Sequence, residues 1–360
     1  MKRRSELYAD YTKAVITSIE VLKKYRFNKV PIDIHYIIKQ TSNIKLCEYS
    51  RYANNVGCSI EEVIEFFQSD LGAISRDPDN NRYVIFYNDT IGNPALDRFT
   101  IAHELGHYFL GHFDLITEKV LRRGGFSAKK YKAIENEANA FARNLLAPVP
   151  LYNKIPLTLS TTSYIWRVMD TFDISFEAAG ARINFAILDN YRITDEDIEY
   201  FNTYKMPYYT CCEQCKNPEI EGSNYCSICG AQLIDDFFVQ EIILKQEGKD
   251  YMIYSGIEVN KYSKAKVCPV CENEEPEYGE YCSICGTHIT NRCTNPRCIN
   301  GPDDGLFGAF LPGNARYCSY CGSKSTFLQN ELLKPWQEEK FEREVEEEIP
   351  DVDEIFDVPF

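Results

Sequence analysis

The pattern His-Glu-x-x-His at residues 103–107 constrains the fold more than any other feature of the chain. It lies in an apolar stretch with helical spacing, and residues four apart share one face of a helix. Both imidazoles can therefore reach one zinc ion, and Glu104 can take a proton from a metal-bound water. The chain has only five histidines, so this pairing is unlikely to arise by chance. The alternative is that the two histidines are ordinary core or surface residues of a helix.

A zinc ion that performs chemistry usually has three protein ligands and one open position. A third histidine from the same segment does not fit the spacing of such motifs. His112 is only five residues past His107, and Leu110 stands where those motifs have glycine. We therefore expect His112 to be a helix-end residue rather than a ligand.

A glutamate from a separate helix is the other route to a third ligand. Apolar spacing predicts one helix at about residues 94–110 and a second at about 128–147, which Pro148 ends. On the second helix Glu135 and Asn139 share a face. We expect Glu135 to bind zinc and Asn139 to hydrogen-bond a ligand imidazole. Glu137 points elsewhere and is expected to be a solvated charge.

Two segments together resemble the ImmA/IrrE family of metallo-endopeptidases: residues 98–107, Arg-Phe-Thr-Ile-Ala-His-Glu-Leu-Gly-His, and residues 135–148, Glu-x-x-Ala-Asn-x-Phe-Ala-x-x-Leu-Leu-x-Pro. The resemblance extends over about residues 7–200. It implies an α+β, zincin-like domain in which His103, His107 and Glu135 carry zinc and Glu104 is the catalytic base. Members of the family typically cleave or inactivate a helix-turn-helix repressor encoded nearby, often on phages or integrative elements, so the resemblance implies such a substrate.

Twelve of the fifteen cysteines pair into three sets after residue 210, and each second half reads Tyr-Cys-Ser-x-Cys-Gly. Four thiolates at such spacings make a closed tetrahedral zinc site, and metal binding supplies the folding energy of such small modules. We predict three structural zinc ions beside one catalytic zinc; a redox Cys-x-x-Cys is the alternative reading. The predicted ligand sets are Cys212, Cys215, Cys226 and Cys229; Cys268, Cys271, Cys282 and Cys285; and Cys293, Cys298, Cys318 and Cys321.

These patterns predict an α+β metallopeptidase domain followed by small β-rich zinc ribbons. The expected boundaries are 1–205 for the peptidase-like domain, 206–234 for ribbon 1, 235–266 for a β-hairpin insert, 267–290 for ribbon 2, 291–328 for ribbon 3, and 329–360 for an acidic, disordered tail.

The distribution of charge and hydropathy indicates which classes of partner the chain can bind. Residues 208–327 carry a net charge of −6 and residues 337–360 carry −9. This disfavours phosphate binding and favours protein contacts through the ribbons or the tail, although a local basic face would still admit nucleic acid. The chain has no apolar run of about 20 residues and no signal-peptide core, so we expect a cytoplasmic protein that does not bind membranes.

The preferred interpretation is a zinc endopeptidase. An oxyanion donor is expected, with Tyr108, His112 and Tyr131 as unranked candidates.

The strand Tyr83–Tyr87 precedes the metal helix, and we expect it either to pair with the substrate backbone at a sheet edge or to be a plain core strand. The alternative function is a non-cleaving regulator that binds a protein, or less readily a nucleic acid, through its ribbons.

Overall fold

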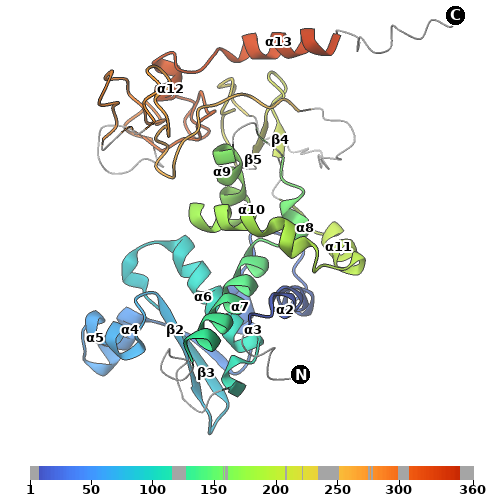
Figure 1. The fold of residues 1–360 in the computed structure, drawn as a ribbon, viewed down its shortest axis with the longest axis vertical. Coiled ribbons are helices and arrows are strands. Elements are labelled where there is room, and N and C mark those ends of the chain that lie inside the picture. The colour runs from blue at the N-terminus through green and yellow to red at the C-terminus, as the bar shows by residue number, and fades with distance from the viewer. Residues whose placement is uncertain are drawn as a thin grey trace, which may run out of the picture. The chain divides into compact units, whose positions relative to one another are not determined.

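The structure is a computed structural model that describes residues 8–115, 127–156, 158, 161–206, 209–220, 222–233, 251–274, 276, 279–298 and 308–348. It divides into two compact units (Figure 1). The first unit comprises Met1–Ile155 and Val168–Met206, and the second comprises Pro156–Arg167 and Pro207–Phe360. None of the described helices combines the length and the apolar composition needed to cross a bilayer.

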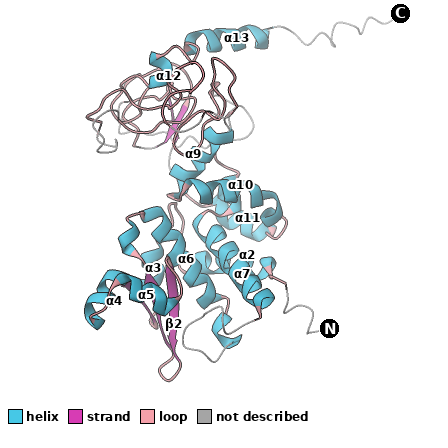
Figure 2. Ribbon diagram, turned by 60° about the vertical axis from the view of Figure 1, so that its left-hand side comes forward, coloured by secondary structure: helices cyan, strands magenta, loops and turns pink. Residues whose placement is uncertain are grey.

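The first unit is the predicted mixture of helices and a small sheet (Figure 2). The long helix α7 packs against both α2 and α6. The helices are α2 (Tyr11–Lys24), α3 (Ile34–Gln40), α4 (Tyr49–Val56), α5 (Ile60–Phe67), α6 (Pro94–Phe109), α7 (Ala128–Leu146), α8 (Val149–Tyr152), α10 (Phe176–Asn190) and α11 (Asp195–Asn202), with 3-10 turns η1 (Asp89–Ile91) and η2 (His112–Leu115).

The sheet has the order β1 (Ile44–Glu48), β3 (Arg82–Tyr87), β2 (Gly72–Asp77). Strand β3 pairs in parallel with β1 and antiparallel with β2. The hypothesis that Tyr83–Tyr87 is a substrate-binding edge is therefore wrong, because both edges of β3 are already paired. Its run of apolar residues suits a central strand that is covered on both faces. Among the described strands, β2 is the edge on the side of α6, which it contacts.

Local sequence explains where the two metal-motif helices begin. Asn93 caps α6 by accepting a hydrogen bond from the Leu96 amide, and Pro94 occupies the first turn. Ser127 caps α7 in the same way, through the Lys130 amide. Helix α7 ends at Leu146, immediately before Ala147 and Pro148. Both helices thus form within one residue of the predicted bounds.

A buried charge network fixes the C-terminal half of α7 against α10. The guanidinium of Arg182, which is fully buried, donates to Asp189 Oδ2 at 2.7 Å and to Asn144 Oδ1 at 3.0 Å. Arg143 Nε donates to the same Asp189 oxygen at 3.1 Å. Burial alone would raise the pKa of Asp189, but Arg143 and Arg182 outweigh it and lower the pKa. The network therefore holds a charged carboxylate between two helices.

We predict that Asp189→Ala destabilises the first unit by about 3–5 kcal/mol, because it leaves Arg182 charged, buried and unpaired. Hydrogen exchange of α7 and α10 measures the effect, with the exposed Glu199→Ala as control. Since the folded pKa of Asp189 is lowered, its contribution is present above the unfolded value near 3.9 and is lost as pH falls through the folded pKa. Unchanged protection in Asp189→Ala contradicts this account.

The second unit consists mainly of loops around the three cysteine clusters. Its described elements are β4 (Tyr209–Cys211), β5 (Pro218–Ile220), α12 (Thr326–Gln329) and α13 (Trp336–Glu348). Beyond the β4–β5 pair, the described residues contain only isolated bridges, such as Tyr225 with Gln232, so the ribbons have less strand than predicted. The thiol clusters, rather than long ladders, organise this unit.

Helix α9 (Thr161–Phe172) was expected to lie wholly in the peptidase-like domain, but residues up to Arg167 belong to the second unit. Hydrogen bonds explain the difference: Thr162 Oγ1 donates to Glu258 at 2.6 Å, and Arg167 donates to the Pro218 carbonyl at 3.4 Å. The other expected domain boundaries stay predictions.

The expected disorder of residues 329–360 is wrong as far as residue 348. Trp336–Glu348 form α13, and Glu339 accepts hydrogen bonds from the Ser255 amide and hydroxyl and from Arg316. These contacts anchor a segment whose composition alone indicated disorder, and residues 349–360 lie outside the described residues. Residues 235–250 of the expected β-hairpin insert also lie outside the described residues, while residues 251–258 form no strand.

Candidate metal centre and cysteine clusters

Close packing of α6 on α7 places the candidate metal ligands together. A Cβ added at Gly106 would lie 3.1 Å from both Ala138 Cα and the Phe141 ring. Glycine on one helix and alanine on the other therefore let the two backbones approach closely. The glycine of the His-Glu-Leu-Gly-His segment thus has a packing role that brings α7 within reach of the two histidines.

The side chains of His103, His107 and Glu135 converge on one point. The two Nε2 atoms lie 3.0 Å apart, and the Glu135 oxygens lie 3.2 Å from His103 Nε2 and 3.6 Å from His107 Nε2. All three candidate ligand atoms lie within 4.8 Å of one another. Two imidazole nitrogens and a carboxylate suit a divalent zinc ion with an open position.

The other nitrogen of each imidazole has a hydrogen-bond partner. His103 Nδ1 lies 2.9 Å from Asn139 Oδ1, the contact that the sequence predicted for Asn139. Because an amide oxygen can only accept, His103 carries its proton on Nδ1. The lone pair of Nε2 then faces His107 and Glu135, as a metal ligand requires.

A series of hydrogen bonds through His112 and Glu137, which the sequence did not reveal, orients the ring of His107. Its Nδ1 lies 2.9 Å from His112 Nδ1, and His112 Nε2 lies 3.0 Å from Glu137 Oε2. The Asp10 amide donates to the other Glu137 oxygen at 2.7 Å. The Glu137 carboxylate accepts from His112 Nε2, so His112 Nδ1 accepts from His107 Nδ1 and leaves His107 Nε2 free for a metal.

These hydrogen bonds correct the expectation for Glu137 and add a role for His112. Glu137 is not a solvated charge, because its side chain is only 12% exposed and both of its oxygens accept hydrogen bonds. Burial alone would raise its pKa, but the hydrogen bonds from His112 and Asp10 lower it. His112 follows the end of α6 and is not one of the candidate ligands, as expected, but it is also buried between His107 and Glu137. The residues around Glu137 in the sequence do not reveal that it lies against Asp10, the residue that caps α2.

Glu104 lines a cavity of about 740 Å³ together with the three candidate ligands. The rest of the lining comes from the end of α5, the start of β2, α6 and α7. Glu104 is only 7% exposed, and burial raises its pKa to about 7, against an opposing effect of His103. A carboxylate with a pKa near neutrality, beside a metal site, suits a general base.

The cavity also ranks the three candidate oxyanion donors. Tyr108 donates to Asn43 Oδ1 at 2.9 Å and is not part of the lining. His112 is engaged between His107 and Glu137. Tyr131 lines the cavity with Glu104 and Glu135, so it is the candidate whose position suits contact with a substrate.

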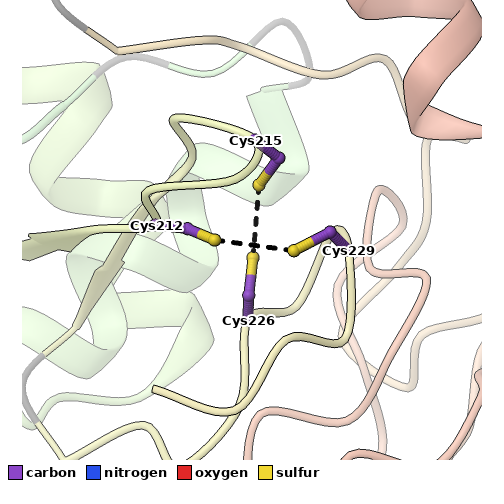
Figure 3. Close-up of side chains that lie close together, drawn as sticks. All are labelled: Cys212, Cys215, Cys226 and Cys229. Atoms are coloured by element: carbon purple, nitrogen blue, oxygen red, sulfur yellow. Dashed lines mark hydrogen bonds between the residues drawn. The ribbon is translucent and has the colours of Figure 1, made fainter. Parts of the chain in front are cut away.

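The twelve predicted cysteines form three clusters with the predicted membership. Figure 3 shows the first, in which Cys212 and Cys229 lie 3.5 Å apart and Cys215 and Cys226 lie 3.4 Å apart. The corresponding sulfur–sulfur distances are 3.6 Å in the second cluster, and 3.4 and 3.7 Å in the third. A tetrahedron with zinc–sulfur bonds of about 2.3 Å has edges of about 3.8 Å, whereas a disulfide is about 2.05 Å. The clusters therefore fit zinc.

Comparison with known proteins agrees with this geometry. Residues 61–184 match the family model described as the IrrE N-terminal-like domain, a peptidase M78 family. The match confirms the resemblance to the ImmA/IrrE metallo-endopeptidases over a range that contains α6, α7 and the cavity. No curated protein matches the chain significantly.

Proposed function

We propose that the IrrE N-terminal-like domain of this chain is a zinc-dependent endopeptidase that hydrolyses a peptide bond in a protein partner. The observation that carries the proposal is the convergence of His103, His107 and Glu135 beside the buried Glu104. The match to a peptidase family supports it. A scaffold that only bound a partner would not need a buried carboxylate at position 104.

In the proposed reaction a zinc ion held by His103, His107 and Glu135 would polarise the scissile carbonyl and increase the acidity of a water. Glu104 Oε accepts the proton of the attacking water and then passes it to the leaving nitrogen. Asn139 holds the ring of His103, while His112 and Glu137 hold the ring of His107. Tyr131, which lines the cavity, contacts the carbonyl oxygen as it becomes negative.

We place the substrate backbone along β2 instead of β3. Gly72 and Ala73, at the start of β2, line the cavity together with Leu71, which directly precedes the strand. The register with β3 and the bond from the Asn88 amide to the Leu71 carbonyl direct the amides of Ile74 and Arg76 away from β3. A peptide that added to this edge would run past the candidate zinc ligands.

Arg76→Pro tests the β2 edge, because it removes an outward amide without removing a bond to β3. We expect cleavage to weaken about tenfold, as the loss of one backbone hydrogen bond predicts, while zinc content stays the same. Arg76→Ala is the matched control, since it removes the same side chain and keeps the amide. Equal cleavage by the two variants contradicts binding along β2. Proline at Val84 or Phe86 would not test substrate binding, because it would disrupt the central strand.

We further propose that the substrate is a helix-turn-helix repressor of a phage or mobile element and that cleavage takes place in the cytoplasm. The family resemblance supports the substrate class, and cysteines grouped as metal-ligand sets suit a reducing compartment. The test is co-expression with the helix-turn-helix protein encoded beside this chain. We expect a cut product, located by mass spectrometry, that a metal chelator abolishes in the purified reaction and zinc restores. An intact protein with zinc-loaded enzyme contradicts the proposed substrate.

A further inference from the structure

Three segments of the second unit share the sequence Tyr-Cys-Ser-x-Cys-Gly: knuckle 1 (residues 225–230), knuckle 2 (residues 281–286) and knuckle 3 (residues 317–322). Their final glycines, Gly230, Gly286 and Gly322, have φ values of 74°, 73° and 71°. The three knuckles therefore have the same turn as well as the same letters. What surrounds them differs.

Knuckles 1 and 3 bind each other through reciprocal backbone hydrogen bonds. The Ser227 carbonyl accepts from the Arg316 and Tyr317 amides at 2.8 and 2.9 Å. The Ser319 carbonyl accepts from the Asn224 and Tyr225 amides at 2.9 and 3.0 Å. Each knuckle, together with the residue that precedes it, thus gives the other one carbonyl and two amides, with the roles exchanged.

The tyrosine rings repeat this reciprocity. A Cβ added at Gly230 would lie 2.7 Å from the Tyr317 ring, and one added at Gly322 would lie 2.7 Å from the Tyr225 ring. Each ring therefore covers the glycine of the opposite knuckle so closely that no other residue fits there. The four backbone bonds and both ring–glycine contacts thus occur twice with exchanged roles, and such a contact is self-complementary, as in a two-fold symmetric interface. Among the described residues, one further bond, from Asn224 Nδ2 to the Tyr320 carbonyl at 3.2 Å, runs in one direction only.

Knuckle 2 has all of these groups but, within the described residues, no such partner. Among the residues that the structure describes, nothing lies within 4 Å of a Cβ built at Gly286, and Tyr281 is 56% exposed. Ile284 is 72% exposed, compared with 44% for the equivalent Tyr320 of knuckle 3, while Ile228 of knuckle 1 is buried in a cluster that contains Tyr254. Across the described part of the chain, the Tyr281 amide and the Ser283 carbonyl make no backbone hydrogen bond.

We infer that knuckle 2 docks on knuckle 2 of a second copy of this chain, in the way that knuckles 1 and 3 dock within one copy. We identify the partner as a second copy of this chain, because one knuckle binds another knuckle through the same groups, and a second copy always carries knuckle 2. Glu280, which precedes the motif, is held by Arg292 Nη1 at 2.8 Å, so the contact does not bring together two unpaired carboxylates. One pair of knuckles buries little surface, so the expected dimer is weak and concentration-dependent.

Gly286→Asn tests this dimer in the full-length, zinc-retaining chain. Asparagine tolerates a positive φ, and its Cβ has open space in one copy but would strike the Tyr281 ring of the other. Gly57→Asn is the matched control, because Gly57 has a φ of 78° and equally open surroundings in the first unit. In sedimentation velocity we expect wild type and Gly57→Asn to shift from monomer to dimer as concentration rises, and Gly286→Asn to stay monomeric with unchanged zinc content.

A photo-crosslinking residue at Ile284 adds a direct readout of which surfaces meet. We expect a crosslinked dimer whose joined peptides both contain residues 279–288. A wild-type chain that stays monomeric to its solubility limit overturns the inference. So does a dimer that persists in Gly286→Asn, or a crosslink from position 284 to another surface or to another protein alone.

Discussion

Glu104→Gln should bind zinc as the wild type does and lose cleavage by a factor of about 10²–10⁴, the usual contribution of a general base. The amide has almost the same shape as the carboxylate, but it cannot accept the proton of the attacking water. Glu104 is not among the three side chains whose atoms converge as candidate ligands, so the metal site should survive. The rate of substrate cleavage and the zinc content of the same sample give both results.

Two comparisons keep this result interpretable. Glu65→Gln makes the same chemical change at an exposed position of α5 and should cleave like the wild type. Glu135→Gln should lose zinc from the first unit as well as cleavage, which separates a ligand from a base. If Glu104→Gln cleaves at the wild-type rate while holding zinc, Glu104 has no part in the reaction.

Cys226→Ala should remove one zinc ion per chain and unfold ribbon 1. Structural zinc contributes about 10–16 kcal/mol of apparent binding energy in small peptide modules at neutral pH, and that energy is also their folding energy. Cys226 is fully buried in the first cluster and precedes Ser227, which binds knuckle 3. Loss of this zinc should therefore also lower the hydrogen-exchange protection of ribbon 3.

Cys211→Ala is the matched control, because Cys211 directly precedes the ligand Cys212 but is outside the four-thiol cluster. It should keep the full zinc content and the protection of both ribbons. Ribbon 2 should keep its protection in Cys226→Ala, because the reciprocal bonds join knuckle 1 only to knuckle 3. An unchanged zinc content in Cys226→Ala would show that the first cluster is not a metal site.

The sequence predicted the elements whose signals are local. Asn93 and Pro94 mark the start of α6, and Pro148 marks the end of α7 within two residues. Helical periodicity then places His103, His107 and Glu135 on faces that can meet. The cysteine sets were equally readable, because each cluster comes from two short segments with fixed spacing.

Features that depend on contacts between distant segments could not be read in this way. Strand β3 is central because β1, about forty residues earlier in the chain, pairs with it in parallel. Glu137 is buried because His112 and the Asp10 amide reach it from two other elements. The acidic helix α13 is anchored because Glu339 accepts hydrogen bonds from Ser255 and Arg316. In each case the residues that determine whether the segment is paired, buried or helical lie far away in the sequence.

The most direct test of the account is a crystal structure of the zinc-loaded chain with anomalous diffraction measured at the zinc edge. We expect one peak in the first unit at about 2.0–2.2 Å from His103 Nε2, His107 Nε2 and a Glu135 carboxylate oxygen, with the remaining position open toward Glu104. A first unit without such a peak, or an ion held there without Glu135, would contradict the proposed peptidase site.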